Sequence, residues 1–139
     1  MTGTRSSDLF ESAAGDGLHL WLRRETGPSG ADRLRLHLLG EIDYEGRADL
    51  DEALAAVARA GTDVVVDLTG ATFLDSHGLG FLVQLRTQLT RSGQTVTLHQ
   101  PTGMVLRALR VMGFDRHFPI THEPDPQAGR ATLPAGPRP

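Results

Sequence analysis

The stretch from Asp63 to Arg91 constrains the fold of this chain more than any other part of it. It opens with the apolar, β-branched run VVVDL at 64–68, which lacks the polar alternation of a half-exposed strand. Such a run is typical of a strand buried on both faces of a sheet. From Gly78 onward apolar residues recur at intervals of three and four, which predicts a helix that ends at Gly93. The apolar face expected for this helix consists of Leu79, Leu82, Val83, Leu85 and Leu89.

The segments on either side of this stretch show the periods of further strands and helices. Residues 18–22 and 34–38 alternate between leucine and other side chains, and the turn sequence GPSG lies between them, which predicts an antiparallel hairpin. Apolar residues on one helical face predict a helix around 50–57 that ends at Gly61. The segment TVTLH at 95–99 predicts a shorter strand.

The last helix of the pattern is expected to begin after Thr102, whose side chain is a suitable N-cap. Its expected apolar stripe is Val105, Leu109 and Met112. The order of elements is then a hairpin followed by helix, strand, helix, strand and helix. Right-handed crossovers place the later strands parallel in one sheet. The sequence therefore predicts a small α/β domain in which a mixed sheet packs against helices.

The length of 139 residues suits one domain with a single hydrophobic core. Residues 1–16 are mostly small or polar, which predicts a flexible N-terminus. The domain itself is expected to span 17–120. Residues 121–139 hold five of the eight prolines and few large apolar side chains, which predicts a disordered, proline-rich tail.

Composition and charge exclude several classes of function. No apolar run approaches the ~18 residues of a membrane span, and no secretory signal is visible, so we expect a cytoplasmic protein without a membrane partner. The chain has no cysteine and no lysine, which excludes disulfides, thiolate chemistry and a P-loop lysine. A net charge of −3 without a basic cluster argues against nucleic acid as a partner.

The loop Asp75-Ser76-His77, between the buried strand and the long helix, is the best candidate for chemistry. A carboxylate or hydroxyl just before a helix accepts hydrogen bonds from the free N–H groups of the first turn, so Asp75 or Ser76 is the expected N-cap. A cap alone would explain both residues. Adjacent residues at a helix start point about 100° apart, which disfavours Ser76 and His77 as a nucleophile and its base.

No cofactor or metal is expected from the remaining motifs. The two glycines at 78 and 80 lack the third glycine of a dinucleotide site and the lysine of a P-loop, so close packing of the helix on the sheet explains them better. The six histidines form no i, i+3 or i, i+4 pair on a helix, which disfavours a metal site. We therefore expect no catalytic residues.

Three sequence blocks resemble a known family. The block GATFLDSHGLGFL at 70–82 resembles the STAS domain, most closely that of the small bacterial anti-sigma factor antagonists. Supporting matches are GEID at 40–43 and MVLRALRVMGFDRHFPI at 104–120, so the resemblance covers roughly 18–120. His77 stands where that family usually has a second hydroxyl residue.

The resemblance implies a function and a set of partners. Such proteins, when unphosphorylated, bind an anti-sigma factor and release the sigma factor it held, which regulates transcription in stress responses. The anti-sigma factor is also a serine kinase that phosphorylates the residue matching Ser76 and so breaks the complex, and a serine phosphatase resets it. The chain is then a phosphoprotein and not an enzyme. The partner-binding residues expected on this basis are Asp43, Asp75, Ser76, His77, Gly78 and Leu79.

Two alternatives stay open at this point. The chain could be a scaffold or sensory STAS module that uses Ser76 structurally or not at all, or it could bind a small molecule. Under the phosphorylation hypothesis, the free N–H groups and the dipole of the helix favour negative charge beside Ser76. A phosphate, which adds about −1.5 to −2 units of charge, is therefore expected to leave the fold intact.

Overall fold

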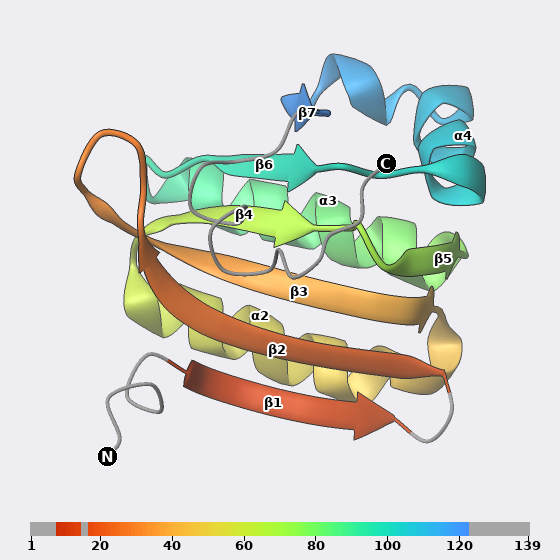
Figure 1. Cartoon of the computed structure of the whole chain (residues 1–139), viewed down its shortest axis with the longest axis horizontal. Helices are drawn as coiled ribbons and strands as arrows, with labels where there is room; N and C mark the ends of the chain where they lie inside the picture. The colour runs from red at the N-terminus through yellow and green to blue at the C-terminus, as the bar shows by residue number, and fades with distance from the viewer. Residues whose placement is uncertain (1–7, 15–16, 123–139) are drawn as a thin grey trace, which may run out of the picture.

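In the computed structural model, a long central strand organises a seven-stranded sheet (Figure 1). Strand β3 (Asp32–Ile42) pairs antiparallel with β2 (Leu18–Thr26), so the predicted hairpin is confirmed. On its other side, the first half of β3 pairs in parallel with β4 (Asp63–Asp67). Strand β6 (Val96–His99) in turn pairs in parallel with β4. The sheet is therefore mixed, as predicted, and β3 joins its antiparallel part to its parallel part.

Three further strands add to those that the sequence predicts. The structure describes residues 8–14 and 17–122, so the predicted disordered tail lies, from residue 123 on, outside the described residues. Strand β1 (Asp8–Ala14) pairs with β2, and the prediction of a flexible segment is wrong for this part of the N-terminus. Strand β5 (Ala71–Leu74) pairs with the second half of β3, and β7 (Ile120–Thr121) pairs with β6.

The helices lie mainly on one side of the sheet. Figure 1 shows α2 (Arg47–Ala60) and α3 (Ser76–Arg91) next to each other behind the strands. Helix α4 (Gly103–Val111) lies at the end of the sheet where β5 runs, and it packs beside β5. Short 3-10 turns precede α2 and follow α4, at η1 (Tyr44–Gly46) and η2 (Phe114–Arg116). The expected order of helices and strands is confirmed.

The core fills the space between the sheet and the two long helices. Alternate residues of the hairpin point into it, which is why leucine recurs at every second position there. Helices α2 and α3 end as predicted, because Gly61 and Gly93 adopt the left-handed conformation that terminates a helix. The fully buried leucines of the hairpin are Leu20, Leu22, Leu34, Leu36 and Leu38.

Two residues assigned to the core by their spacing are exposed instead. Val83 of α3 lies on the outer side of the helix, while its neighbours Phe81, Leu82 and Leu85 are buried in the core. Met112 follows the last turn of α4, so its side chain leaves the stripe that Val105 and Leu109 form. The predicted apolar faces are therefore wider than the faces that pack.

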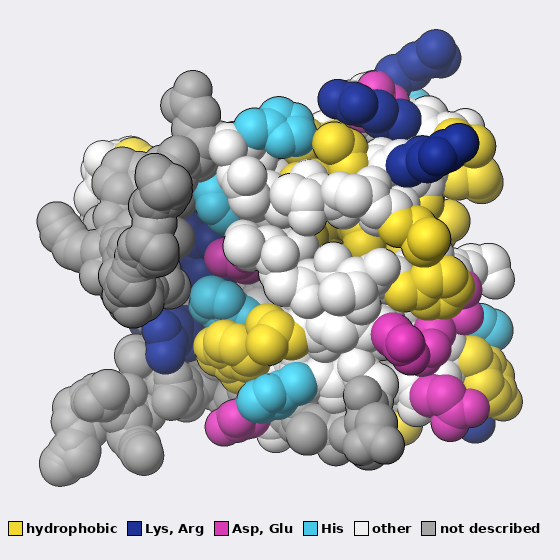
Figure 2. All heavy atoms as spheres, turned by 45° about the vertical axis from the view of Figure 1, so that its right-hand side comes forward, with side chains coloured by type: hydrophobic (Ala, Val, Ile, Leu, Met, Phe, Trp, Pro, Cys, Tyr) yellow, Lys and Arg dark blue, Asp and Glu magenta, His cyan; other side chains and the backbone are white. Residues whose placement is uncertain are grey.

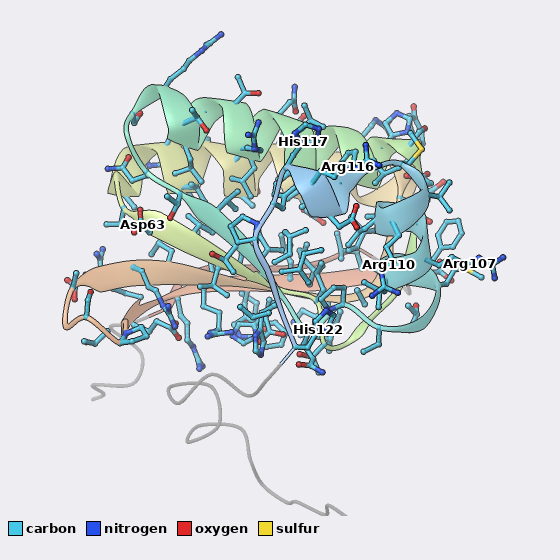
Figure 3. The ribbon with its side chains drawn as sticks, turned by 90° about the horizontal axis from the view of Figure 1, so that it is seen from above. Asp63, Arg107, Arg110, Arg116, His117 and His122 are labelled. Carbon is cyan, nitrogen blue, oxygen red and sulfur yellow. The ribbon has the colours of Figure 1, made fainter. Side chains whose placement is uncertain are left out.

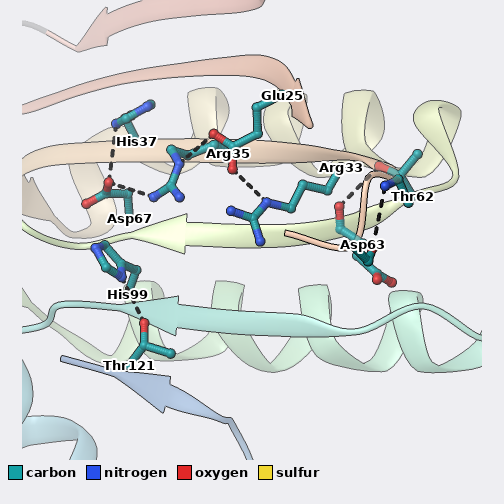
Figure 4. Close-up of polar contacts among 11 residues, drawn as sticks. Glu25, Arg33, Arg35, His37, Thr62, Asp63, Asp67, His99 and Thr121 are labelled. Carbon is teal, nitrogen blue, oxygen red and sulfur yellow. Dashed lines mark hydrogen bonds and ion pairs between the residues drawn. The ribbon is translucent and has the colours of Figure 1, made fainter. Parts of the chain in front are cut away.

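The face of the sheet opposite the long helices carries a chain of charged side chains (Figure 4). Arg35 donates from Nε to Glu25 and from Nη1 to Asp67, at 2.9 Å in both cases, and Arg33 donates to Glu25 at 2.6 Å. His37 Nδ1 lies 3.8 Å from Asp67 Oδ2. Burial lowers the pKa of His37 from 6.5 to about 4, so the ring is neutral at neutral pH. The contact with Asp67 is therefore an ion pair only in acid.

Candidate functional site

Two strands that end side by side position the candidate site. Ile42 at the end of β3 and Leu74 at the end of β5 are neighbours in the parallel register. Asp43 and Asp75 follow them directly, so two aspartates distant in the sequence reach the same edge of the sheet. The backbone N–H of Asp75 donates to the carbonyl of Ile42 at 3.2 Å and joins the two chain segments. The structure thus brings Asp43 to the loop that carries Ser76.

Asp75 is the N-cap of α3, which resolves the choice between Asp75 and Ser76. Its Oδ1 accepts hydrogen bonds from the backbone N–H groups of His77 at 2.8 Å and of Gly78 at 3.0 Å. Its Oδ2 accepts a third bond from the N–H of Tyr44 at 3.2 Å. One carboxylate therefore holds the start of α3 and the turn before α2 together.

Ser76 is the first residue of α3, and its side chain is exposed. Within residues 8–14 and 17–122, its hydroxyl has no hydrogen-bond partner, since Asp75 satisfies the first turn of the helix. A serine that served only as a cap would direct its oxygen to these N–H groups. The hydroxyl of Ser76 is instead available to another molecule.

The two glycines that follow have different environments. A Cβ added to Gly78 would lie 2.5 Å from both the carbonyl oxygen of Ile42 and a methyl group of Leu74, so only glycine fits where α3 meets the strand ends. A Cβ added to Gly80 would meet nothing within 4 Å. Close packing on the sheet therefore explains Gly78, and it is the wrong explanation for Gly80.

An open hollow lies beside Ser76, between the first turns of α2 and α3. Arg47 places its guanidinium 3.7 Å from the ring centre of Tyr44 and donates from Nη1 to the Tyr44 carbonyl at 3.0 Å. The His77 ring meets the Tyr44 ring edge-on, with centroids 4.7 Å apart. The residues that line the hollow are Arg47, Leu50, Asp51, Ser76, His77, Gly80, Phe81, Val83 and Gln84.

The sequence prediction does not include several of these neighbours. Tyr44 and Arg47 come from the chain around GEID, about 30 residues before Ser76, and only the fold brings them to it. Tyr44 directly follows Asp43, so the predicted site stops one residue short of it. In the sequence, the one signal that points to Tyr44 is an aromatic residue directly after the GEID motif.

The six residues expected at the partner surface differ in their exposure to solvent. Ser76 and His77 are exposed. Asp43 and Asp75 are half-buried, and both accept backbone hydrogen bonds, Asp43 from Glu45 at 3.1 Å. Gly78 is buried and Leu79 packs against the core. The last two residues position the site, and the surface that another molecule can reach is formed by Ser76, His77 and their neighbours in the hollow.

A phosphate on Ser76 would find three N–H groups at the start of α3 already engaged. Those of His77 and Gly78 donate to Asp75, and that of Leu79 donates to the Asp75 carbonyl at 2.9 Å. The Asp75 carboxylate adds negative charge close by. Arg47 and His77 line the same hollow as Ser76, and Arg47 carries a positive charge there. The helix dipole is therefore one contribution among several to the charge balance at Ser76.

Across the part of the chain that the structure describes, acidic, histidine and cysteine side chains do not gather in threes as a metal ion would require. None of the helices there has the length and apolar character needed to cross a membrane.

Comparison with known proteins identifies the family. The family model described as "Mlab, STAS domain" matches residues 28–121, which is more than half of the chain. Together with the α/β fold and the serine at the start of α3, this match places the chain in the STAS domain family. A STAS-domain-containing protein of Pseudomonas aeruginosa is 31% identical over 88 residues, which cover 63% of this chain and 87% of that protein.

Further relatives include anti-sigma factor antagonists. The anti-sigma-B factor antagonist of Bacillus subtilis is 26% identical over 80 residues, covering 58% of this chain and 73% of that protein. The crystal structure of an anti-sigma factor antagonist from Mycobacterium paratuberculosis matches with a TM-score of 0.63 and 25% identity, over 81% of this chain and 92% of that one. The antagonist SpoIIAA in its unphosphorylated form shares the fold, with a TM-score of 0.58 at 16% identity, over 78% of this chain and 94% of that one.

Proposed function

We propose that this protein is an anti-sigma factor antagonist that acts in the cytoplasm and is switched off by phosphorylation of Ser76. The observation that carries the proposal is that the adjacent residues Asp75 and Ser76 have different roles in the structure. Asp75 caps α3 by accepting two of its N–H groups and accepts a third bond from Tyr44, while the hydroxyl of Ser76 is exposed and unengaged among the described residues. The relatives that are anti-sigma factor antagonists support the same function.

In the unphosphorylated state, the surface around Ser76 binds the anti-sigma factor. Ser76 and His77 offer a neutral hydroxyl and an imidazole, and the exposed ring of Tyr44 lies beside them. Aromatic and polar side chains at an open hollow suit the centre of a protein interface. Binding of the anti-sigma factor at this surface releases the sigma factor, which can then direct transcription.

Inactivation requires a kinase, which in this proposal is the anti-sigma factor itself. The Ser76 hydroxyl oxygen forms a bond to the γ-phosphorus of Mg-ATP, and the bond from that phosphorus to ADP breaks. The proton of the hydroxyl passes to a general base of the kinase, and ADP leaves. This chain supplies only the acceptor oxygen, so it is a substrate and not an enzyme. A serine phosphatase hydrolyses the phosphoserine and restores the binding state.

The phosphate weakens the complex because it places two negative charges where the partner meets a neutral hydroxyl. Like charges brought together in an interface, or a phosphate left without a counter-charge, cost several kcal/mol. Since about 1.4 kcal/mol corresponds to a tenfold change in affinity, we expect the phosphoprotein to bind at least tens of times more weakly.

Calorimetric titration with the anti-sigma factor that phosphorylates the protein tests the proposal. The proteins compared are the wild type, Ser76→Ala, Ser76→Asp and the phosphoprotein. We expect Ser76→Ala to bind like the wild type and to remain unphosphorylated with Mg-ATP, and the other two to bind poorly. Circular dichroism checks that all four are folded.

Equal affinities across these four folded proteins would reject the switch. They would favour a scaffold or sensory STAS module in which Ser76 has no regulatory role. Phosphorylation at a residue other than Ser76, detected by fragment mass analysis of the wild type, would also contradict the proposal. Thr87→Ala, which removes an exposed hydroxyl elsewhere on α3, is the matched control and should be phosphorylated like the wild type.

A further inference from the structure

Helix α4 exposes an unusual amount of apolar side chain for so short an element. Among the residues whose side chains the structure describes, the three most exposed large hydrophobic residues are Val111, Met104 and Met112, at 75%, 60% and 57% of their maximal areas. All three lie on α4 or directly after it. The inner face of α4 is held by Val105 and Leu109, both fully buried. The outer face contributes nothing to the core, so its apolar side chains need another explanation.

Three arginines border these apolar side chains. Arg107 lies between Met104 and Val111 at helical spacing, and Arg110 and Arg116 lie on either side of the helix end (Figure 3). All three are exposed, and within the described part of the chain none of them makes an ion pair. We call the surface formed by Met104, Arg107, Arg110, Val111, Met112 and Arg116 the α4 patch.

The charge of the α4 patch contrasts with that of the whole chain. Between residues 103 and 117 there are three arginines and one acidic residue, Asp115, whereas the complete chain carries a net charge of −3. Figure 2 shows positive side chains gathered at the top of this face, hydrophobic side chains below them and acidic side chains farther down. The positive charge on this face is therefore local to α4 and the turn that follows it.

We propose that the α4 patch is a docking surface for an acidic amphipathic helix of a partner protein. Methionine and valine offer an adaptable apolar strip, since methionine side chains fit many shapes. Arginines beside such a strip form bidentate contacts with carboxylates and are enriched in interfaces. A helix with an apolar stripe flanked by glutamates or aspartates complements both features of the α4 patch.

A protein helix fits the surface better than a membrane or a nucleic acid. An anionic membrane and a nucleic acid duplex both spread their negative charge over an area broader than one helix. Either would bring its negative charge against the acidic side chains that share this face in Figure 2. A single helix, about 10 Å wide, can lie along α4 without covering them. Because the positive charge covers only a small area, a single helix of a partner protein is the occupant that fits it best.

The α4 patch lies close to the Ser76 loop without sharing residues with it. Helix α4 packs beside β5, and β5 leads directly into Asp75 and Ser76. A partner bound at the α4 patch is thus near enough to contact the Ser76 surface as well. The proposal does not depend on that second contact, and it holds whether or not Ser76 is phosphorylated.

The chain carries built-in probes for a test by NMR. Its three methionines are Met1, Met104 and Met112, so labelling with ¹³C-methyl methionine gives two signals from the α4 patch and one from elsewhere. The probe ligand is a synthetic helical peptide of about four turns with a leucine stripe flanked by glutamates. Its matched twin has lysine in place of every glutamate. We expect the glutamate peptide to shift Met104 and Met112, with at least tenfold higher affinity than the lysine peptide.

Charge reversal makes the test specific. In the double variant Arg107→Glu and Arg110→Glu, we expect the preference to invert in favour of the lysine peptide. The control is Arg59→Glu with Arg91→Glu, two exposed arginines at the far ends of α2 and α3, which should keep the wild-type preference. If circular dichroism shows that the double reversal perturbs folding, Arg107→Gln with Arg110→Gln replaces it and should abolish the preference.

Three results would overturn the proposal. The first is that the glutamate peptide leaves both methyl signals in place up to millimolar concentration, and the second is that it binds the reversed variant as well as the wild type. The third result is a shift of the same signals by vesicles of phosphatidylglycerol and phosphatidylcholine at physiological salt, which would assign the surface to a membrane instead.

Discussion

At the scale of single residues, Arg47 is the side chain best placed to respond to a phosphate on Ser76. Its guanidinium rests against Tyr44, and it lines the same hollow as Ser76. Because the Asp75 carboxylate already accepts the N–H groups of His77 and Gly78, a side-chain cation is the stronger counter-charge for a phosphate there. Arg47 can exchange its contact with Tyr44 for a charge-assisted bond to the phosphate.

We predict that Arg47→Gln raises the second pKa of phosphoserine 76, because arginine favours the dianion. A ³¹P NMR titration of protein carrying phosphoserine at this position measures the change. Arg59→Gln, on the same helix and also exposed, is the control and should not alter the titration. Identical curves for wild type and Arg47→Gln would show that the phosphate is balanced by solvent or by His77 alone.

The two glycines near Ser76 are expected to respond in opposite directions to alanine. Gly78→Ala forces a methyl group against the backbone carbonyl of Ile42, so we predict a loss of about 1–3 kcal/mol of unfolding free energy. Gly80→Ala adds a methyl group in open space and removes the entropic cost of glycine in a helix. We predict a gain of up to about 1 kcal/mol.

Urea denaturation of both variants measures these changes. A gain in stability for Gly80→Ala together with weaker binding of the anti-sigma factor would indicate that the partner approaches α3 closely at this position. A loss of stability in Gly80→Ala equal to that in Gly78→Ala would contradict the difference in packing.

The sequence predicts the role of a site residue when that role depends on its neighbours in the sequence, and not when it depends on distant segments. The cap is a local feature, and the pattern Asp75-Ser76 before a helix narrows it to two candidates. The structure selects Asp75, whose Oδ1 accepts the N–H groups of His77 and Gly78. The further bond from the Tyr44 N–H to Oδ2 of Asp75 joins segments distant in the sequence, so no local pattern predicts it. Tyr44 and Arg47 lie near Ser76 because β5 pairs with β3, and no local sequence pattern predicts that pairing.

At the scale of elements, the charged face of the sheet gives the fold a sensitivity to acid. His37 on β3 faces Asp67 on β4 and Arg23 and Glu25 on β2, with Arg35 on its own strand. Burial dominates these effects and lowers its pKa to about 4. The pKa of His37 in the unfolded chain is about 6.5. Between about pH 6.5 and pH 4, His37 is therefore protonated in the unfolded chain and neutral in the folded one.

The sign of the resulting pH dependence follows from that depressed pKa. The contribution of His37 to stability is complete above about pH 6.5 and is lost as the pH falls through about 4. We predict that His37→Gln removes this contribution, which amounts to at most about 3 kcal/mol, and so flattens the curve of unfolding free energy between these pH values. His117→Gln, at an exposed position, should leave the curve unchanged. A curve of the same slope in His37→Gln would show that other groups cause the acid sensitivity.

Elements with their own period are predictable from the sequence, and elements defined by pairing are not. The hairpin and the three helices each carry a clear apolar repeat, and the buried strand shows a continuous apolar run. Strands β5 and β7 have only four and two residues, which is too short to show a period. Strand β1, with the sequence DLFESAA, pairs with the open edge of β2. This pairing explains why the segment is a strand, since its composition does not predict one.

The exposed positions of Val83 and Met112 show the limit of the helical repeat. Spacing identifies which residues share a face, but it does not fix how wide a strip the sheet covers. On α4 the difference matters, because the apolar side chains left outside contribute to the α4 patch. The same hydrophobic residue in a sequence can thus indicate either a core or an interface.

At the scale of the whole molecule, the proposed functions gather at one end of the sheet. Parallel strands β3 and β5 end at the Ser76 loop, and α4 lies beside them (Figure 1). The opposite ends of α2 and α3 carry the glycines that stop them and no candidate site. An insertion or a fusion at that far end is therefore compatible with both proposed surfaces.

The position of β3 also bears on how the chain is made. Its antiparallel partner precedes it in the sequence, but β4 and β5, which pair with its other edge, follow it. During synthesis from the N-terminus, the hairpin of β2 and β3 is complete while its leucine face and one edge of β3 still lack their coverings. Such a half-built sheet exposes apolar surface and unpaired backbone groups. The interval before α2 and β4 leave the ribosome is therefore the time at which the nascent chain most needs protection by chaperones.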